Sequence, residues 1–98
     1  MSKAVFTIRY DIIPAKREEY LNVIKELKTL IKADGLESYS VFEHKNHENT
    51  FTEIYLFESR KAYEDFDDDP DERVDILMNK LSDMIVQQTT NYSVLYEI

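Results

Sequence analysis

The chain has 98 residues, 43% of them hydrophobic, and its 12 basic and 20 acidic side chains give a formal net charge of −8. This length and balance predict one small folded domain, spanning residues 1–98, rather than a disordered segment. The sequence has no cysteine and only one glycine. Disulfides, thiolate metal sites, cysteine nucleophiles and glycine-rich phosphate loops are therefore excluded.

The charge and hydropathy patterns exclude further classes. The longest hydrophobic run is Ile54–Phe57, whereas a membrane-spanning helix needs about 20 apolar residues, so we expect a cytoplasmic protein with no membrane partner. The acidic excess is concentrated in Glu64–Glu72. Binding to nucleic acid is not expected, because it requires a concentrated patch of Lys and Arg.

The first strand is expected over residues 4–12, where apolar positions alternate with mainly polar ones. Pro14 should end this strand because proline has no N–H to donate. A helix is expected over Ala15–Ala33, where apolar residues recur every three or four positions and form one stripe. Gly35 is expected to be the left-handed residue that caps this helix.

Two strands are expected next, over Leu36–His44 and Thr50–Glu58, joined by a polar turn at Lys45–Asn49. The second of these strands has the strongest β pattern in the chain. Ser59 is then well placed to accept the first backbone hydrogen bonds of a short helix over Arg60–Phe66.

A second long helix is expected to start at Asp69, with Pro70 in its first position, and to carry its apolar stripe as far as Ile85. The last strand is expected over Tyr92–Ile98. The order strand–helix–strand–strand–helix–strand predicts an α+β, ferredoxin-like fold, in which four antiparallel strands carry both helices on one face.

Apolar side chains fall on both faces of the predicted sheet. In the third strand, Tyr55 and Phe57 share one face, while Ile54 and Leu56 lie on the other. The helices can cover only one face, and the chain has no further element to cover the second. We therefore expect a homodimer that packs sheet against sheet into an α/β barrel.

Four segments carry a resemblance to a known family: Ile13–Tyr20, Gly35–Tyr39, Asn49–Phe51 and Phe57–Tyr63. In these segments the chain resembles the dimeric α/β-barrel superfamily, and within it the antibiotic-biosynthesis-monooxygenase type of domain. The resemblance covers nearly the whole chain and is specific for the fold. It is weak for chemistry, because the superfamily also includes isomerases, haem-degrading enzymes and ligand sensors.

The sequence departs from that family at two aromatic positions. The family commonly has Trp at the position of Phe57 and often His at the position of Phe66. Haem-degrading relatives bind iron through a His that would fall near Ile76, which cannot be a ligand. Haem degradation is therefore disfavoured.

The resemblance implies oxygenation without a cofactor. In such relatives, a phenol or hydroquinone substrate is deprotonated in a dry pocket and then reduces oxygen directly. The protein has to supply an apolar cavity, a group that removes the proton and donors that stabilise the oxyanion.

Glu53 is the candidate base, because period two places it between Phe51 and Tyr55 on one strand face, where an apolar flank would raise its pKa. Arg9 is the candidate that would hold an oxyanion. The alternative is structural: Glu53 and Arg9 on neighbouring strands could form an ion pair.

Aromatic side chains are the candidate substrate-binding residues. Tyr10, Tyr55, Tyr63 and Tyr96 could line a pocket with Phe57, and Phe66 could form part of its lid. The alternative is packing at the edge of the core or in a dimer interface, for which tyrosine is well suited.

His44 and His47 are the only histidines, and their spacing invites a metal interpretation. They are expected in or beside a hairpin, where this spacing does not align two side chains, so a solvated turn is favoured and no metal is assigned. His44 alone is a further acid–base candidate.

Two functions remain open from the sequence. One is a cofactor-independent monooxygenase, or a related isomerase, acting on aromatic or quinol-like small molecules. The other is a dimer of the same fold that binds a small aromatic ligand or regulates without turnover. A structural dimer whose interior is filled by its own aromatic side chains is a third interpretation.

Overall fold

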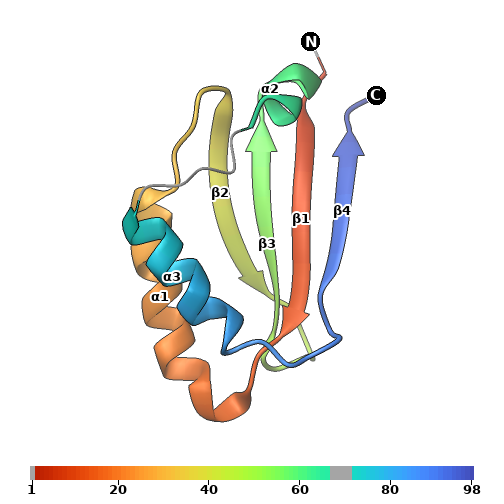
Figure 1. Ribbon diagram of the computed structural model, residues 1–98. Helices are drawn as coiled ribbons and strands as arrows, with labels where there is room; N and C mark the ends of the chain where they lie inside the picture. The colour runs from red at the N-terminus through yellow and green to blue at the C-terminus, as the bar shows by residue number, and fades with distance from the viewer. Residues whose placement is uncertain (1, 67–71) are drawn as a thin grey trace.

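A computed structural model describes residues 2–66 and 72–98 and has one antiparallel sheet (Figure 1). Its strands lie in the order β2-β3-β1-β4, and their bounds are β1 Ala4–Asp11, β2 Leu36–Glu43, β3 Thr50–Phe57 and β4 Asn91–Tyr96.

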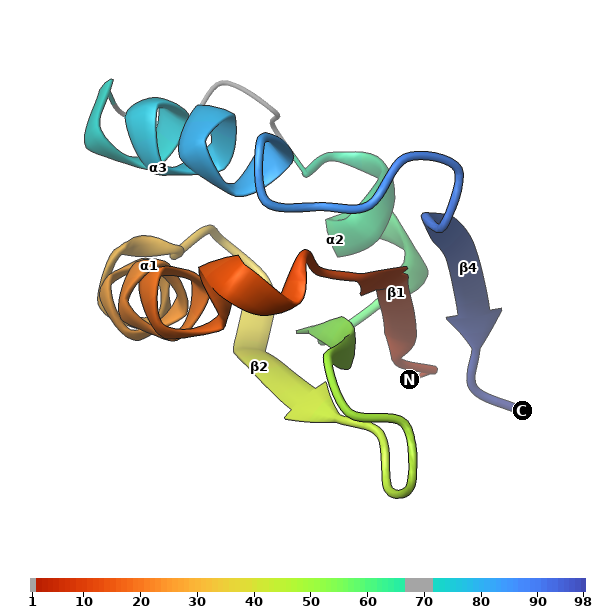
Figure 2. The same cartoon turned by 90° about the horizontal axis from the view of Figure 1, so that it is seen from below.

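The helices are α1 (Arg17–Leu30), α2 (Arg60–Glu64) and α3 (Glu72–Ser82), and a short 3-10 helix η1 (Pro14–Lys16) precedes α1. Figure 2 shows the three α-helices on one side of the curved sheet. The α+β, ferredoxin-like fold predicted from the element order is therefore confirmed.

The first helix differs from its prediction at both ends. Its start is the 3-10 turn that begins at Pro14, and α1 itself ends at Leu30 rather than Ala33. Gly35 has a φ of +80°, as expected, but it lies in the turn before β2, and the residue that ends α1 is Ile31 in an extended conformation. Gly35 is therefore not the helix cap. A Cβ at this position would lie 2.5 Å from the Cβ of Ala62, so glycine also permits the close approach of α2.

The predicted cap of α2 is confirmed, because Ser59 Oγ accepts a hydrogen bond of 3.0 Å from the N–H of Ala62. The predicted start of α3 at Asp69 and Pro70 lies outside the described residues. The helix ends at Ser82 rather than continuing to Ile85.

The reason for this early end is a backbone connection to the end of β1. The N–H of Ile13 donates to the carbonyl of Met84 at 2.8 Å, and the N–H of Val86 donates to the carbonyl of Asp11 at 2.9 Å. Ile85 also forms an isolated β-bridge with Ile12. These bonds satisfy backbone groups that a longer helix would have used internally.

The strand register defines the two faces of the sheet. The helix-facing side carries Ala4, Phe6, Ile8, Tyr10, Tyr39, Val41, Phe51, Glu53, Tyr55, Phe57, Tyr92, Val94 and Tyr96. The other side, which we term the open sheet face, carries Val5, Thr7, Arg9, Ser40, Phe42, Thr52, Ile54, Leu56, Ser93 and Leu95.

The hydrophobic core lies between the helix-facing side of the sheet and the helices. Tyr20 and Leu27 of α1, Leu77 of α3 and Phe57 of β3 all belong to this core. The open sheet face remains uncovered in the single chain, and its side chains Phe42 and Leu95 are each 58% exposed. Within the described parts of the chain, no helix is both long enough and apolar enough to cross a membrane.

Candidate functional site

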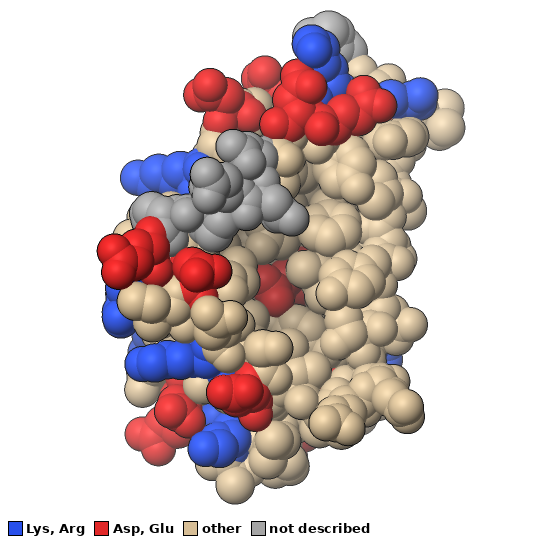
Figure 3. All heavy atoms as spheres, viewed as in Figure 1, with Lys and Arg blue, Asp and Glu red and all other residues tan. Residues whose placement is uncertain are grey.

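A cavity of about 870 Å³ lies between the helix-facing side of the sheet and α3. Figure 3 shows acidic atoms at the bottom of a hollow beside the helices, next to a broad uncharged surface over β1 and β4. The volume falls within the range of about 300 to 1,000 Å³ that is typical of small-molecule sites.

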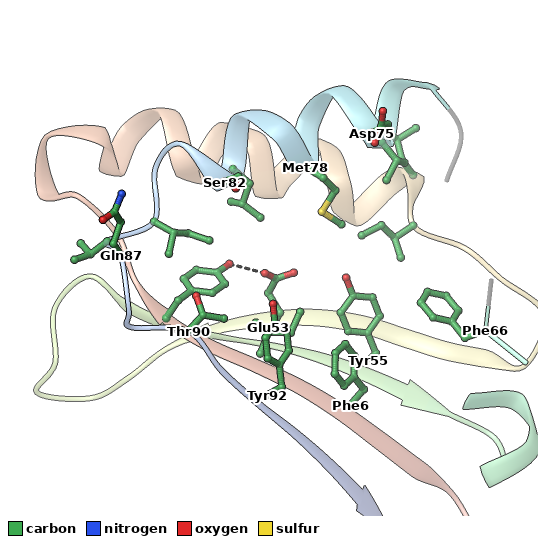
Figure 4. A pocket seen from close by; sticks show the side chains of 18 of the residues that line it. Phe6, Glu53, Tyr55, Phe66, Asp75, Met78, Ser82, Gln87, Thr90 and Tyr92 are labelled. Atoms are coloured by element: carbon green, nitrogen blue, oxygen red, sulfur yellow. Dashed lines mark hydrogen bonds between the residues drawn. The ribbon is translucent and has the colours of Figure 1, made fainter. Parts of the chain in front are cut away.

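Aromatic and aliphatic side chains form most of the cavity wall. Phe6, Ile8, Tyr55 and Tyr92 contribute from the strands, and Val74, Met78 and Leu81 contribute from α3. Figure 4 shows Glu53 rising from the sheet into the middle of the cavity, with Gln87 and Thr90 toward one end and Asp75 and Phe66 toward the other.

Glu53 is held by two phenolic hydroxyl groups. Tyr10 donates to its Oε2 at 2.7 Å, and Tyr39 donates to its Oε1 at 2.7 Å. Tyr20 lies 2.7 Å from the hydroxyl of Tyr10 and extends the chain of hydrogen bonds into the core. We call these four residues the Glu53 network. The side chain of Glu53 is only 2% exposed, although it lines the cavity.

Burial raises the pKa of Glu53 above its ordinary value of 4.5, because the charged form loses its hydration. The hydrogen bonds from Tyr10 and Tyr39 oppose this effect, since they stabilise the carboxylate. The pKa values of both tyrosines are raised, first by burial and then by the nearby charge of Glu53. The hydroxyl groups therefore keep their protons and act as donors.

Arg9 lies on the open sheet face, opposite to Glu53. The register pairs Arg9 with Thr52 and Ile8 with Glu53, so the two charged side chains point to different sides of the sheet. The alternative ion pair between them does not form. Arg9 is exposed and lies outside the cavity of the single chain.

The aromatic candidates divide into two groups. Tyr10, Tyr55 and Phe66 line the cavity together with Glu53, whereas Phe57, Tyr63 and Tyr96 do not. Phe57 is fully buried and packs against Tyr63 and Phe66, with ring centroids 5.6 and 5.2 Å away. Phe57 therefore supports Phe66 from the core side of the cavity.

No sequence motif marks Tyr39 and Tyr20 as residues of a functional site. Tyr39 is placed by the β2–β3 register, in which it pairs with Tyr55, and Tyr20 is the first buried residue of α1. The apolar stripe of the first helix includes Tyr20, whereas no pattern in 36–44 assigned a face to Tyr39. Their convergence on one carboxylate depends on how three separate elements pack.

His44 lies at the β2–β3 hairpin, where its Nε2 is 2.5 Å from Thr52 Oγ1. Thr52 belongs to the open sheet face, so its partner His44 lies away from Glu53 and the cavity. Among residues 2–66 and 72–98, no group of three or more His, Cys, Asp or Glu side chains is placed to hold a metal ion.

The fold and the cavity define a class of protein: a small ferredoxin-like domain with an aromatic pocket built on one buried carboxyl group. The family model described as antibiotic biosynthesis monooxygenase matches residues 4–72, which is most of the chain. This protein belongs to that family, as the sequence resemblance implied.

Solved structures show the same fold. A conserved protein from Methanosarcina mazei Go1 is 16% identical, with a TM-score of 0.79 over 100% of this chain and 95% of that one. Rv0793 from Mycobacterium tuberculosis is 14% identical, with a TM-score of 0.74 over 98% and 95% of the two chains.

A variant of SnoaB, a cofactor-independent oxygenase from Streptomyces nogalater, is 12% identical, with a TM-score of 0.71 over 95% of this chain and 90% of that one. A search of curated proteins gave no significant match.

Proposed function

We propose that this protein is a monooxygenase that uses no cofactor and acts on an aromatic molecule bearing a phenol or hydroquinone group. The observation that carries the proposal is the position of Glu53, a buried carboxyl group in the middle of an aromatic cavity. Membership of the antibiotic biosynthesis monooxygenase family supports it, and so does the fold shared with SnoaB, a cofactor-independent oxygenase.

In the proposed reaction, Glu53 takes the proton of the substrate hydroxyl group. Its raised pKa makes it a stronger base than an exposed glutamate, and aromatic side chains would surround the anion that forms. The substrate anion then supplies the electrons that reduce dioxygen. One oxygen atom becomes a new carbonyl group on the ring, which turns a phenol into a quinone, and the other leaves as water.

Oxygen consumption tests this function directly. The purified protein is mixed with a panel of hydroquinones, naphthols and anthrone-like tricyclic phenols, and oxygen uptake is recorded with an electrode. Removing the base by Glu53→Gln should lower the rate by at least about 100-fold, since general-base catalysis typically contributes that much.

Glu48→Gln is the matched control, because it removes the same charge from an exposed hairpin position. Its rate should equal that of the wild type. Binding of a phenol without oxygen uptake would instead favour the second function, a binding or regulatory protein without turnover. A rate unaffected by Glu53→Gln would reject Glu53 as the base.

We also propose that the working form is a homodimer joined through the open sheet face. The single chain has an accessible surface of 6742 Å², whereas a monomer of its mass is expected to expose only about 5,900 Å². Ile54, Leu56 and Leu95 give the open sheet face an apolar centre. A second copy would bury this centre and would bring the outward-pointing Arg9 into the interface.

A further inference from the structure

We infer that the cavity selects an aromatic ligand that is uncharged and donates a hydrogen bond to Glu53, and that it disfavours rings that present only acceptors or a negative charge there. The inference deepens the proposed function, because it rests on a ring bound against Glu53. It names the chemical state of the ligand rather than the ring system.

The preference for a ligand that donates a hydrogen bond follows from the number of hydrogen atoms in the Glu53 network. Each tyrosine hydroxyl has one hydrogen, and those of Tyr10 and Tyr39 are both directed to the carboxylate. The hydroxyl of Tyr20 must then donate to Tyr10, since the hydrogen of Tyr10 is already used. All three hydrogens are committed within the network.

Glu53 itself can still accept further hydrogen bonds. A carboxylate has about four lone-pair positions, and the two tyrosines use one on each oxygen. Because Glu53 lines the cavity, a remaining position can accept an O–H or N–H from a ligand. The hydrogen bonds from Tyr10 and Tyr39 favour the ionised form of Glu53, and in that form a carbonyl or ether oxygen placed there would face a carboxylate that has no hydrogen to offer.

The preference for an uncharged ligand follows from the charges around the cavity. Among the described lining residues, Glu53 and Asp75 are acidic and Lys32 is the single base, and Lys32 is exposed. Glu53 takes part in none of the ion pairs found in the described parts of the chain. A ligand carboxylate near Glu53 would therefore meet an uncompensated like charge in a poorly hydrated space.

This selection separates the substrate of the proposed reaction from its product. The phenol presents an O–H to Glu53, whereas the quinone has a carbonyl oxygen at the same position. Loss of that hydrogen removes a hydrogen bond to a charged group and leaves two acceptors facing each other. The site therefore binds the reduced ring and releases the oxidised one.

Three stable probes on one ring system test the inference: 2-naphthol, 2-methoxynaphthalene and 2-naphthoate. Their dissociation constants are measured by fluorescence titration at pH 8 under nitrogen, so that no turnover takes place. We expect 2-naphthol to bind at least about tenfold more tightly than the methyl ether, because a hydrogen bond to a charged group is at stake. The anionic naphthoate should bind more weakly still.

Glu53→Gln should reduce the preference for 2-naphthol over the ether to less than about threefold, because an amide offers an N–H donor as well as an acceptor. Glu48→Gln should retain the wild-type preference. The comparison of the three probes on the wild-type protein needs no variant, so it holds even where Glu53→Gln does not fold.

Equal affinity for the naphthol and its ether, tightest binding of naphthoate, or binding of none of the three would overturn the inference. The outcome is separable from that of the proposed function. A donor preference without any oxygen uptake would reject the enzyme and leave the selectivity intact. Glu53-dependent oxygen uptake without a donor preference would support the enzyme and reject the proposed selectivity.

Discussion

Glu53 occupies an environment that a charged side chain rarely tolerates. It is surrounded by the hydrophobic core and lies on the strand between Phe51 and Tyr55. Its two hydrogen bonds from tyrosine compensate part of the cost of burying a carboxylate. A buried carboxyl group that faces a cavity is the kind of arrangement found where a proton has to be taken or given.

The raised pKa of Glu53 has a consequence for stability. The folded protein binds this proton more tightly than the unfolded chain, whose glutamate titrates near 4.5. The contribution is therefore fully present below pH 4.5 and is lost as the pH rises through the higher folded pKa. We expect the free energy of unfolding of Glu53→Gln, relative to the wild type, to increase with pH above 4.5, by about 1.4 kcal/mol for each unit of pKa shift.

Urea denaturation at several pH values between 5 and 8 measures this difference. Glu48→Gln serves as the reference, and its curve should run parallel to that of the wild type. Parallel curves for Glu53→Gln as well would show that the carboxyl group titrates alike in the folded and unfolded states.

At the scale of secondary-structure elements, the contact between the turn before β2 and helix α2 depends on two small residues. Gly35 adopts a positive φ, and its α-hydrogen faces the methyl group of Ala62. The carbonyl of Gly35 also accepts a hydrogen bond of 2.8 Å from the N–H of Glu58, just after β3. This junction holds α2 against the end of the sheet from which Phe66 reaches the cavity.

Gly35→Ala should destabilise the protein by more than about 1 kcal/mol, because alanine disfavours a left-handed backbone. The added methyl group would also lie 2.5 Å from that of Ala62. Adding Ala62→Gly should relieve this overlap, so the double variant should lose less stability than the two single variants together.

Thermal and urea unfolding of the four proteins gives this comparison. Asp34→Ala, at the exposed neighbouring position, is the control and should change stability little. Additive losses would mean that the backbone conformation of Gly35, rather than its contact with Ala62, carries the whole effect.

At the scale of the whole molecule, the sheet is half covered. The helices bury one face, while the open sheet face and the outer strand β4 stay accessible, and every residue of β4 is exposed. The helix-facing Tyr92 is 67% exposed at the margin of the cavity. The margin of the cavity at β4 is therefore accessible in the single chain.

The proposed homodimer predicts a solution mass of about twice 11.7 kDa. Leu95→Arg, on the β4 part of the open sheet face, should shift the protein toward the monomer, because it places a charge in an apolar interface. Ile76→Arg is the matched control, since Ile76 is an exposed apolar residue on α3.

Sedimentation velocity over a range of concentrations distinguishes the two forms. A wild-type protein that remains monomeric at high concentration would rule out this interface. A Leu95→Arg variant that stays dimeric while Ile76→Arg does not would place the interface on the helical side instead.

The sequence alone determined the order of the elements and which face of each was apolar. Period two in 50–58, the stripe along 20–31 and the cap at Ser59 are local signals, because backbone geometry fixes them over a few residues. For the same reason, Glu53 could be recognised as a carboxylate among aromatic residues on one strand face. The family resemblance, which covers nearly the whole chain, supported the same ferredoxin-like fold.

Only the tertiary structure decided what surrounds Glu53. A shift of one residue in strand register moves a side chain to the other face, so the sequence could not tell whether Arg9 would meet Glu53. In the structure Arg9 lies on the open sheet face, and Tyr10, Tyr20 and Tyr39 come from three different elements to form the network. The site depends on how distant segments pack, and that information is spread over the whole chain rather than held in any one motif.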